Sequence, residues 1–389
     1  MQISDRGAGQ VRAGIAQGLA VVTALALLVL AAIFDRAWVM RHILPEFFEP
    51  RDEQFRTLTI VRLSAVGLAL LLLWPVRPWL GRWAARRDAA RIAADVLPTL
   101  LAVVLAVGAS ELLLRRLPWF STHQLPTQRE PLRRRDPTLG WAYADNRVGR
   151  GALGGRMIEY AFDAAGHRVR GPGERVDYAA PSILFVGESI ISGHGVTYDE
   201  TIPARVGAAL GLQPADLAVG GYATDQMYLR LEAEWPRYAR PRALVILFMP
   251  SLFHRNLEHD RPHLTPGLAW RPPSDDPRLA QIAHRLVPYR SDQDLADGVA
   301  MTHQALAAMV AMARAKGATP LILVPDLQPE TVEEEAIGAS VLAGLPYLRV
   351  ALDPAWRVPR NRHPDARADA ALAAAVAGYL RPRLVAPGP

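Results

Sequence analysis

Three long apolar runs constrain this chain more than any other feature of its sequence. They cover residues 14–34, 58–76 and 96–114. About 20 consecutive apolar residues form a helix that crosses the roughly 30 Å hydrocarbon layer of a bilayer. The first run is longer than the apolar core of a cleaved signal peptide, so we expect it to stay in the chain. We therefore predict a membrane region over residues 1–116 with three transmembrane helices.

Arginine distribution predicts how these helices are oriented. Three spans place the N-terminus and the residues after 116 on opposite sides, and arginine-rich short loops stay in the cytoplasm. The connection 77–91 holds five arginines, which favours a cytoplasmic N-terminus, whereas arginines at 115, 116, 129 and 133–135 argue weakly against it. We expect a multi-pass protein of the bacterial inner (plasma) membrane, with its C-terminal domain on the extracytoplasmic, periplasmic side.

Two charged residues stand inside or beside these runs. Arg62 lies near one end of the second run, where its long side chain can reach the interface. Glu111 lies near the end of the third. It is either a functional acid inside the membrane or a residue at headgroup depth beside Arg115 and Arg116, and we favour the second interpretation.

Composition excludes several classes of protein. The chain has no cysteine, which excludes a disulfide scaffold, a thiolate zinc site and a cysteine nucleophile. Its net charge of +6 comes almost entirely from arginine, since Lys316 is the only lysine. No basic block is interleaved with aromatic residues, so we expect no nucleic-acid partner. We also expect no cofactor.

One group of histidines has spacing that a metal site could use. His254, His259, Asp260 and His263 are separated by gaps that fit one face of a helix, but Pro262 interrupts that helix. A solvated loop is the better interpretation, and we predict no metal site.

After residue 116 the sequence becomes that of a soluble protein. Residues 117–180 are rich in Pro, Gly and Arg and form a lead-in segment that we expect to pack on a domain covering 181–389. Short apolar runs typical of buried parallel strands occupy 182–186, 216–219, 243–249, 320–324 and 347–351. Helical patterns occupy 201–210, 225–235, 292–316 and 364–380, with Thr224 expected to cap the second and Pro364 to open the last. This alternation predicts an α/β fold in three layers, a parallel sheet with helices on both faces.

A serine follows the first predicted strand at a glycine-bearing turn. The strand runs directly into Gly187, Glu188 and Ser189, with Gly193 shortly after. Ligands bind beyond the carboxyl ends of such strands, so Ser189 is placed as a nucleophile whose own amide can stabilise an oxyanion. Ile191 stands where an α/β-hydrolase elbow needs glycine, and no Gly-Lys-Ser/Thr follows for a phosphate loop. A merely structural turn is the alternative.

Three sequence blocks together resemble the SGNH/GDSL hydrolases. The first is Phe185-Val-Gly-Glu-Ser189 with Gly193, the second is Leu217-Ala-Val-Gly-Gly221-Tyr-Ala-Thr-Asp-Gln, and the last is His363-Pro-Asp-Ala. Residues 136–141 and 163–168 are similar to a segment that precedes the domain in membrane-anchored members. The resemblance spans about 130–385 and implies a three-layer, flavodoxin-like SGNH domain after the three spans.

The resemblance also implies roles for particular residues. Ser189 would be the nucleophile, and His363 the base that takes its proton. The amides of Ser189 and Gly221 would form the oxyanion hole.

Three positions depart from the family pattern. Glu188 replaces the usual Asp of the nucleophile turn. Aligning Asn256 with the Asn that closes the third block puts Ser251 where the family has an oxyanion-hole Asn, and losing such a donor costs about 10²–10³ in rate. Asn361 stands at the position of the triad acid, where an Asn costs serine proteases about 10⁴. Asp353, Asp365 or a backbone carbonyl are alternatives as the group behind His363.

These features predict a membrane-anchored serine esterase or O-acyltransferase acting on ester-linked acyl groups of envelope glycans or lipids. If the chain transfers acyl groups, a separate membrane acyltransferase is the expected partner, because three spans are too few to import a donor. The substitutions at 188, 251 and 361 motivate the alternative of a weak or inactive domain that binds an envelope polysaccharide or organises an envelope complex. A cytoplasmic thioesterase-like role would require the inverted topology.

Overall fold

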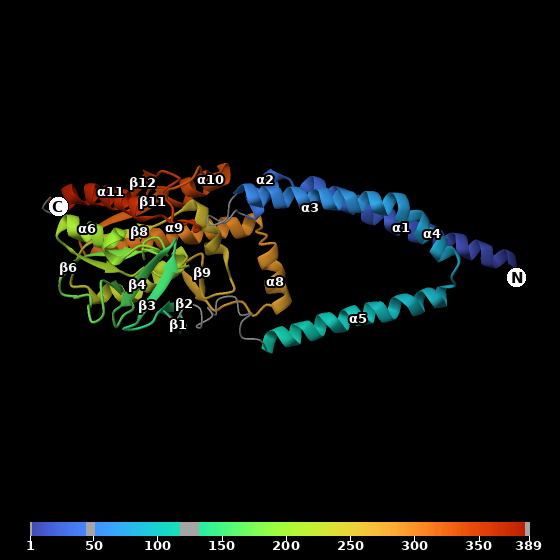
Figure 1. The fold of residues 1–389 in the computed structure, drawn as a ribbon, viewed down its shortest axis with the longest axis horizontal. Helices are drawn as coiled ribbons and strands as arrows, with labels where there is room; N and C mark the ends of the chain where they lie inside the picture. The colour runs from blue at the N-terminus through green and yellow to red at the C-terminus, as the bar shows by residue number, and fades with distance from the viewer. Residues whose placement is uncertain (1, 44–50, 117–131, 386–389) are drawn as a thin grey trace. The chain divides into compact units, whose positions relative to one another are not determined.

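The chain folds into two compact units. A computed structural model describes residues 2–43, 51–116 and 132–385 (Figure 1). One unit, here called the helical unit, combines the helices before residue 117 with the segment 277–288. The other, here called the sheet unit, contains the remaining helices and all the strands that the structure describes.

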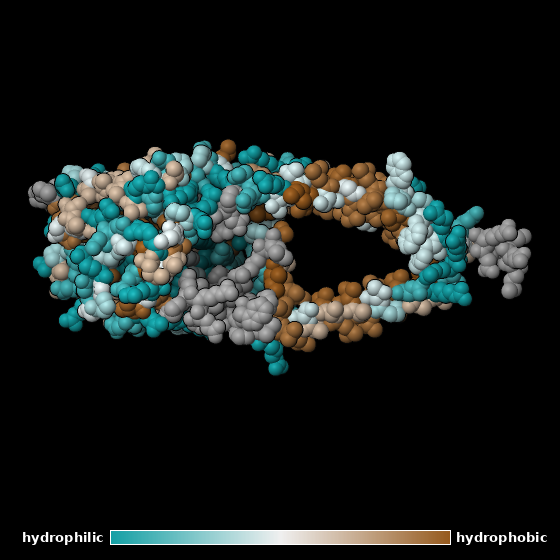
Figure 2. Space-filling model, in the orientation of Figure 1, coloured by the Kyte–Doolittle hydropathy of each residue, from teal (hydrophilic) through white to brown (hydrophobic). Residues whose placement is uncertain are grey.

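The helical unit is built from long apolar helices. Its elements are α1 Gln2–Ile33, α2 Arg36–His42, α3 Arg51–Leu71, the π-helical turn η1 Leu72–Val76, α4 Arg77–Ala85, α5 Ala89–Arg116 and α8 Arg278–Leu286. Among the described residues, three helical stretches are long and apolar enough to cross a membrane: Gly7–Ile33, Arg51–Ala85 and Ala89–Arg116. They extend the predicted runs into polar flanks, since helical hydrogen bonding does not stop where hydrophobicity does. Hydrophobic surface gathers over α1, α3 and α5 (Figure 2).

Small residues hold α1 against its neighbours. Ala24 and Ala69 are fully buried. A Cβ on Gly9 would meet the Ala85 carbonyl oxygen at 3.1 Å, so α1 and α4 approach closely there. Arg62 Nε donates to the Ala31 carbonyl at 2.8 Å, near the end of α1. Small residues at helix contacts are the usual means of close packing where lipid is the solvent.

The sheet unit centres on five parallel strands. These are β6 Pro181–Val186, β7 Gln213–Asp216, β8 Arg240–Leu247, β11 Thr319–Asp326 and β12 Tyr347–Ala351, in the order β12-β11-β8-β6-β7. The helices between them are α6 Ile202–Leu210, α7 Thr224–Glu234, α9 Asp292–Ala315, α10 Val332–Val341 and α11 Ala366–Val385. Short 3₁₀ turns occupy η3 Tyr198–Glu200, η4 Trp235–Arg237 and η5 Pro250–Leu257, and β9 His263–Thr265 pairs with β10 Ala269–Arg271. The predicted α/β fold class is confirmed.

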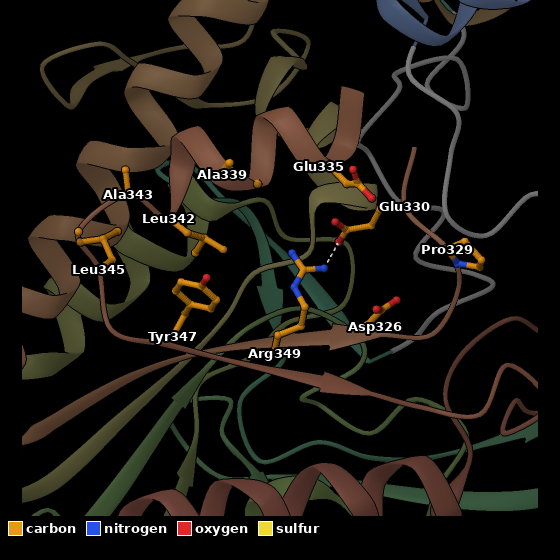
Figure 3. A pocket seen from close by; sticks show the side chains of 12 residues that line it. Asp326, Pro329, Glu330, Glu335, Ala339, Leu342, Ala343, Leu345, Tyr347 and Arg349 are labelled. Carbon is orange, nitrogen blue, oxygen red and sulfur yellow. Dashed lines mark ion pairs between the residues drawn. The ribbon is translucent and has the colours of Figure 1, made fainter. Parts of the chain in front are cut away.

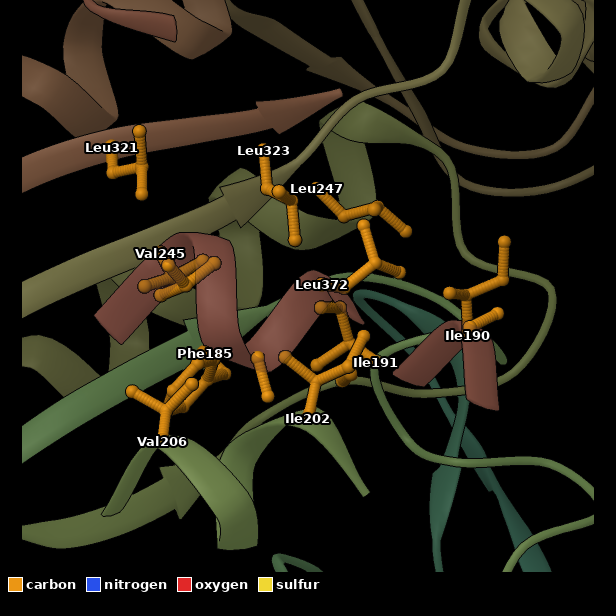
Figure 4. Packing of buried hydrophobic residues seen from close by; sticks show 14 of the residues in the cluster. Phe185, Ile190, Ile191, Ile202, Val206, Val245, Leu247, Leu321, Leu323 and Leu372 are labelled. Carbon is orange, nitrogen blue, oxygen red and sulfur yellow. The ribbon is translucent and has the colours of Figure 1, made fainter. Parts of the chain in front are cut away.

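Helices cover both faces of this sheet. On one face, α6 and α11 pack on alternate residues of the central strands, and Phe185, Val245, Leu323, Val206 and Leu372 lie in that cluster (Figure 4). On the other face, α7 and α9 pack together, and α9 contacts β8 and β11. The buried central strands therefore read as continuous apolar runs in the sequence, because both of their faces are covered.

Several predicted boundaries differ from the observed ones by a few residues, and three of these differences have a physical reason. Residues 217–219 lie beyond β7, and this run is apolar because it is buried: Leu217 N still donates to the Phe185 carbonyl at 2.9 Å. Thr224 is the first residue of α7 and not its cap, since Ala223 holds the N-cap position. The last helix begins at Ala366 and not at Pro364, because the Asp365 carboxylate accepts the amide of Arg367 at 2.8 Å.

The lead-in segment contains short antiparallel strands that its weak periodicity did not predict. They are β1 Arg133–Asp136, β2 Gly140–Tyr143, β3 Val148–Leu153, β4 Arg156–Phe162 and β5 Arg168–Val169. At the end of this segment Arg168 is buried, with its guanidinium stacked over the Tyr160 ring at 4.6 Å. It donates to the carbonyls of Ser192, Gly193 (2.7 Å) and Val196 (2.8 Å). Arg168 thus holds the loop that follows β6 from the lead-in side.

Replacing Arg168 with methionine should destabilise the sheet unit strongly. The change removes the guanidinium donor from three carbonyls, of which Gly193 keeps the Val196 amide at 3.2 Å, and it removes a buried charge that faces Asp216 and Asp369. We expect the free energy of unfolding to fall by about 3–5 kcal/mol, measured by urea unfolding of the detergent-solubilised chain. Arg150→Met is the matched control, because Arg150 pairs with Glu159 at the surface, where such pairs contribute about 0–1 kcal/mol. Equal losses in the two variants would contradict the role given to Arg168.

Candidate active site

The structure brings Ser189 and His363 together from opposite ends of the sheet unit's sequence. Ser189 lies in the turn after β6, and His363 lies between β12 and α11. His363 Nε2 is 2.7 Å from Ser189 Oγ. The turn folds tightly at Gly187, where a Cβ would lie 2.5 Å from Ile191 Cγ1. A serine and a histidine at this distance form the pair that nucleophilic catalysis requires.

Asn361 occupies the position behind the histidine. His363 Nδ1 is 2.5 Å from Asn361 Oδ1, and the His363 backbone amide donates to the same oxygen at 2.9 Å. Because this oxygen is an acceptor, Nδ1 carries the proton and Nε2 is left to accept from Ser189. The two alternative acids are engaged elsewhere, Asp353 with the amide of Ala355 and Asp365 with Arg367.

Glu188 introduces a second carboxylate at the nucleophile. Its side chain is buried, one oxygen accepts the Ser189 hydroxyl, and the other accepts the Ile190 amide at 2.8 Å. Arg255 Nη1 lies 3.2 Å from Glu188 Oε2. Burial alone would raise the pKa of the Glu188 carboxyl, but the charge of Arg255, the charge that His363 carries when it is protonated and these hydrogen bonds outweigh it and lower the pKa. An ionised Glu188 therefore competes with His363 for the hydroxyl proton.

The environment of His363 keeps its imidazole neutral. Burial lowers the pKa of His363 to about 4; Glu188 opposes the shift, while the nearby His194 and Arg255 add to it. The rings of His194 and His363 are 4.7 Å apart between centroids. A neutral imidazole whose Nε2 carries no proton is the form that can act as a base.

The predicted oxyanion turn is braced by the lead-in segment. Trp141 Nε1 donates to the Gly220 carbonyl at 3.1 Å, and the Gly220 amide donates to the Tyr143 hydroxyl at 3.2 Å. Gly221 has a φ of +83°, which favours glycine, and its carbonyl accepts from Arg261 at 3.0 Å. These contacts set the orientation of the peptide whose Gly221 amide is predicted to bind an oxyanion.

Arg133 is a site residue that sequence reasoning missed. A Cβ on Gly220 would lie 2.8 Å from Arg133 Nη2 and 3.6 Å from Ser189 Cβ. The guanidinium therefore packs against Gly220 on the side that faces Ser189 and leaves no room for a larger residue at position 220. In the sequence Arg133 belongs to a run of three arginines near a membrane span, and no local signal separates it from its neighbours.

The remaining predicted residues have structural partners. Ser251 lies buried at the start of η5, and its predicted donation to an oxyanion stays a prediction. Asn256 accepts the Thr224 amide at 2.8 Å and donates to Thr302 at 2.9 Å, so it ties α7 to α9. Gly193 has a φ of +71°, and its carbonyl receives the Arg168 guanidinium.

The histidines considered for a metal site lie on and near η5 and β9. The rings of His259 and His263 stack with centroids 4.6 Å apart, and His263 Nδ1 lies 2.9 Å from the Arg261 carbonyl. Within the described part of the chain, no three His, Asp or Glu side chains are arranged to hold a metal ion.

A hollow of about 730 Å³ lies elsewhere in the sheet unit, between α10 and β12 (Figure 3). Tyr347 and Arg349 line it from β12, and Arg349 pairs with Glu330 at 2.8 Å. Neither Ser189 nor His363 lines this hollow, so its contents bear on no step at the serine.

Comparison with known proteins gives similarity of fold only. No family model and no curated protein matches the chain. Among solved structures, it is similar to the acetyl xylan esterase Est2A from the rumen bacterium Butyrivibrio proteoclasticus (13% identity, 54% of this chain, 66% of that chain, TM-score 0.34). It is also similar to a putative lipolytic protein of the G-D-S-L family from Desulfitobacterium hafniense DCB-2 (12%, 51%, 98%, 0.32) and to the salicylyl-acyltransferase SsfX3 from a tetracycline biosynthetic pathway (15%, 56%, 59%, 0.31).

The strand order, the serine turn after β6 and the histidine before the last helix agree with the resemblance of the sequence blocks. The fold is an α/β fold in which helices cover both faces of a parallel sheet, as the sequence predicts. The chain spans just under two thirds of Est2A, and these similarities assign no substrate to it.

The lowered pKa of His363 predicts an unusual pH dependence. Because the base must be neutral, the rate at which Ser189 reacts with a serine-directed phosphonate should fall only as the pH drops through about 4, not through the ordinary histidine value of about 6.5. Asn361→Asp should move this midpoint upward, since a carboxylate behind Nδ1 favours the imidazolium, and it should raise the rate at neutral pH. A wild-type midpoint near 6.5, unmoved in the variant, would contradict the assignment.

Proposed function

We propose that the chain is a membrane-anchored serine esterase or O-acyltransferase. The observation that carries this proposal is the 2.7 Å approach of His363 Nε2 to Ser189 Oγ, with Nδ1 held by Asn361. A turn lined by backbone amides and an arginine lies beside the serine. Together they supply a nucleophile, a neutral base and donors for a developing negative charge.

The proposed reaction has two steps. Ser189 Oγ attacks the carbonyl carbon of an ester while His363 Nε2 takes the hydroxyl proton, and the oxyanion is met by the amides of Ser189 and Gly221. As the tetrahedral intermediate collapses, the protonated His363 gives its proton to the leaving alcohol and an acyl-enzyme is left. Water, or a sugar hydroxyl, then attacks the acyl carbonyl carbon while His363 Nε2 takes its proton, and His363 gives that proton to Ser189 Oγ as the bond between Oγ and the acyl carbon breaks.

Membrane attachment limits which esters are within reach. The three long apolar helices support anchoring, and the arginine-rich connection 77–91 favours an extracytoplasmic sheet unit. Acyl esters of envelope glycans or lipids are therefore the proposed substrates. If the acyl-enzyme is resolved by transfer, a membrane acyltransferase would supply the acyl group.

A second candidate is a domain that binds an envelope polysaccharide without turnover. Two contacts favour it. The ionised Glu188 accepts the Ser189 hydroxyl in competition with His363, and Asn361 cannot stabilise an imidazolium by charge. Both contacts make His363 a weaker base towards Ser189, and neither alters the surface that a polysaccharide would contact.

A fluorophosphonate probe separates the two candidates. Serine-directed labelling of the full-length chain in detergent is expected for wild type and should be lost in Ser189→Ala and in His363→Ala. A folded wild-type chain that fails to label would favour the binding role. The probe reads the nucleophile alone, so it is independent of the unidentified ester.

The same reaction tests the side of the membrane on which the sheet unit lies. A charged fluorophosphonate that cannot cross the inner membrane should label intact spheroplasts and spare sealed inverted vesicles. The reverse pattern would overturn the extracytoplasmic assignment and favour a cytoplasmic thioesterase-like role, with the serine chemistry retained.

Arg133→Met should slow this labelling while leaving the fold intact. The tetrahedral phosphonate resembles the oxyanion intermediate, so losing a donor beside Gly220 should lower the labelling rate by about 10²–10³. Arg134→Met is the matched control, because the neighbouring Arg134 is exposed and pairs with Asp136 and Asp145. Equal rates in the two variants, at equal melting temperatures, would show that Arg133 takes no part.

A further inference from the structure

Helix α8 belongs to the helical unit although its sequence lies inside the hydrolase part of the chain. It falls between β10 and α9, yet residues 277–288 cluster with the helices before residue 117. The chain leaves the sheet unit at Pro277, forms one short helix, and returns after Pro288. A shorter loop could connect β10 with α9, so this connection alone does not explain why α8 lies in the helical unit.

The start of α8 is held by a residue of the third long helix. Its N-cap is Pro277, which offers no side-chain acceptor for the first amides. The Glu111 carboxylate of α5 takes that role: Arg278 N donates to one of its oxygens and Leu279 N to the other, each at 2.8 Å. Arg115 Nε also donates to Glu111, at 2.7 Å. A carboxylate at a helix N-terminus satisfies free amides and complements the helix dipole.

The sequence of α8 is amphipathic. Leu279, Ile282 and Ala283 recur at helical spacing on one side, whereas Gln281 and His284 lie on the other. Leu279 and Ile282 are only half-buried, and Ala283 is exposed. Among the described side chains of α8, the apolar side is therefore only partly covered by protein.

The position of this helix indicates what covers its apolar side. Glu111 lies within the last turns of a 28-residue apolar helix, where a helix that crossed a bilayer would meet the headgroups. Figure 1 shows α8 running across that end of α5 and not along it. If α5 crosses a bilayer, α8 lies along the bilayer surface. Val287, just beyond the helix, is 51% exposed.

We propose that α8 is an interfacial helix whose apolar side lies in the lipid surface at the end of the third span. Glu111 docks it there, and the polar side faces water. This geometry matches amphipathic helices that lie in the plane of the interface. The proposal rests on the membrane anchoring proposed above, but not on the ester chemistry. It would make the chain from β10 to α9 a second attachment of the hydrolase part to the membrane.

The absence of cysteine allows a direct test. Single cysteines are introduced as Ile282→Cys on the apolar side, as His284→Cys on the polar side, and as Leu105→Cys in the middle of α5. Each full-length variant is spin-labelled and reconstituted in phosphatidylethanolamine/phosphatidylglycerol vesicles. The collision rates of the label with oxygen, which partitions into lipid, and with a water-soluble nickel complex are then compared.

We expect the labels at 282 and 105 to collide mainly with oxygen, and the label at 284 mainly with nickel. Positions 282 and 284 are two residues apart and point to nearly opposite sides of a helix. Opposite reagent preferences at these two positions therefore indicate that the helix lies along a boundary between lipid and water. Equal nickel access at 282 and 284, or shielding of 282 from both reagents by protein, would overturn the proposal if 105 is in lipid. Nickel access at 105 would refute the membrane anchoring itself, which distinguishes the two failures.

Discussion

The candidate site depends on how the buried carboxylate of Glu188 is paired and hydrogen-bonded. A carboxylate out of water must be paired and hydrogen-bonded, and here Arg255, the Ile190 amide and the Ser189 hydroxyl fulfil this requirement. The serine is thereby held between a carboxylate and an imidazole. Arg255 adds to the low pKa of His363, and Glu188 opposes it. The protonation of the base is thus set by charges on two other elements as well as by burial.

The lead-in segment completes this arrangement. Its strands supply Arg168, which binds the carbonyls of the serine loop, and Trp141 and Tyr143, which bind the neighbouring glycine turn. They also supply Arg133, beside the nucleophile. A site assembled from the five-stranded sheet alone would lack the donors that orient both turns. The lead-in segment thus supplies contacts that the candidate site needs. Its arginines have different roles because they reach different parts of the site, Arg168 the serine loop and Arg133 the glycine turn.

Glu111 shows the same principle near the end of the apolar helix α5. As an isolated acid near the end of an apolar helix it is costly, and its cost is offset by Arg115 and by two backbone amides from a helix about 170 residues later in the chain. The sequence supported headgroup depth through Arg115 and Arg116. The other partners of Glu111 are the backbone amides of Arg278 and Leu279 in α8, and no helix was predicted from the sequence at these positions.

The sequence by itself determined the three apolar helices and the order of strands and helices along the sheet unit, because hydrophobic periodicity is a local signal. It paired Ser189 with His363 only through the resemblance of its blocks to the SGNH/GDSL hydrolases. It predicted that Asn361 stands behind the histidine, but left Asp353 and Asp365 open. The prediction from sequence was wrong at 217–219, where a buried loop has the apolar composition of a strand. The short strands of the lead-in segment were not predicted either, because these show no hydrophobic alternation. Only the tertiary structure decided the partners of Glu188, the place of Arg133 and the docking of α8. Those contacts join residues far apart in the chain, and the local sequence around a charged residue does not predict which distant residue it will contact.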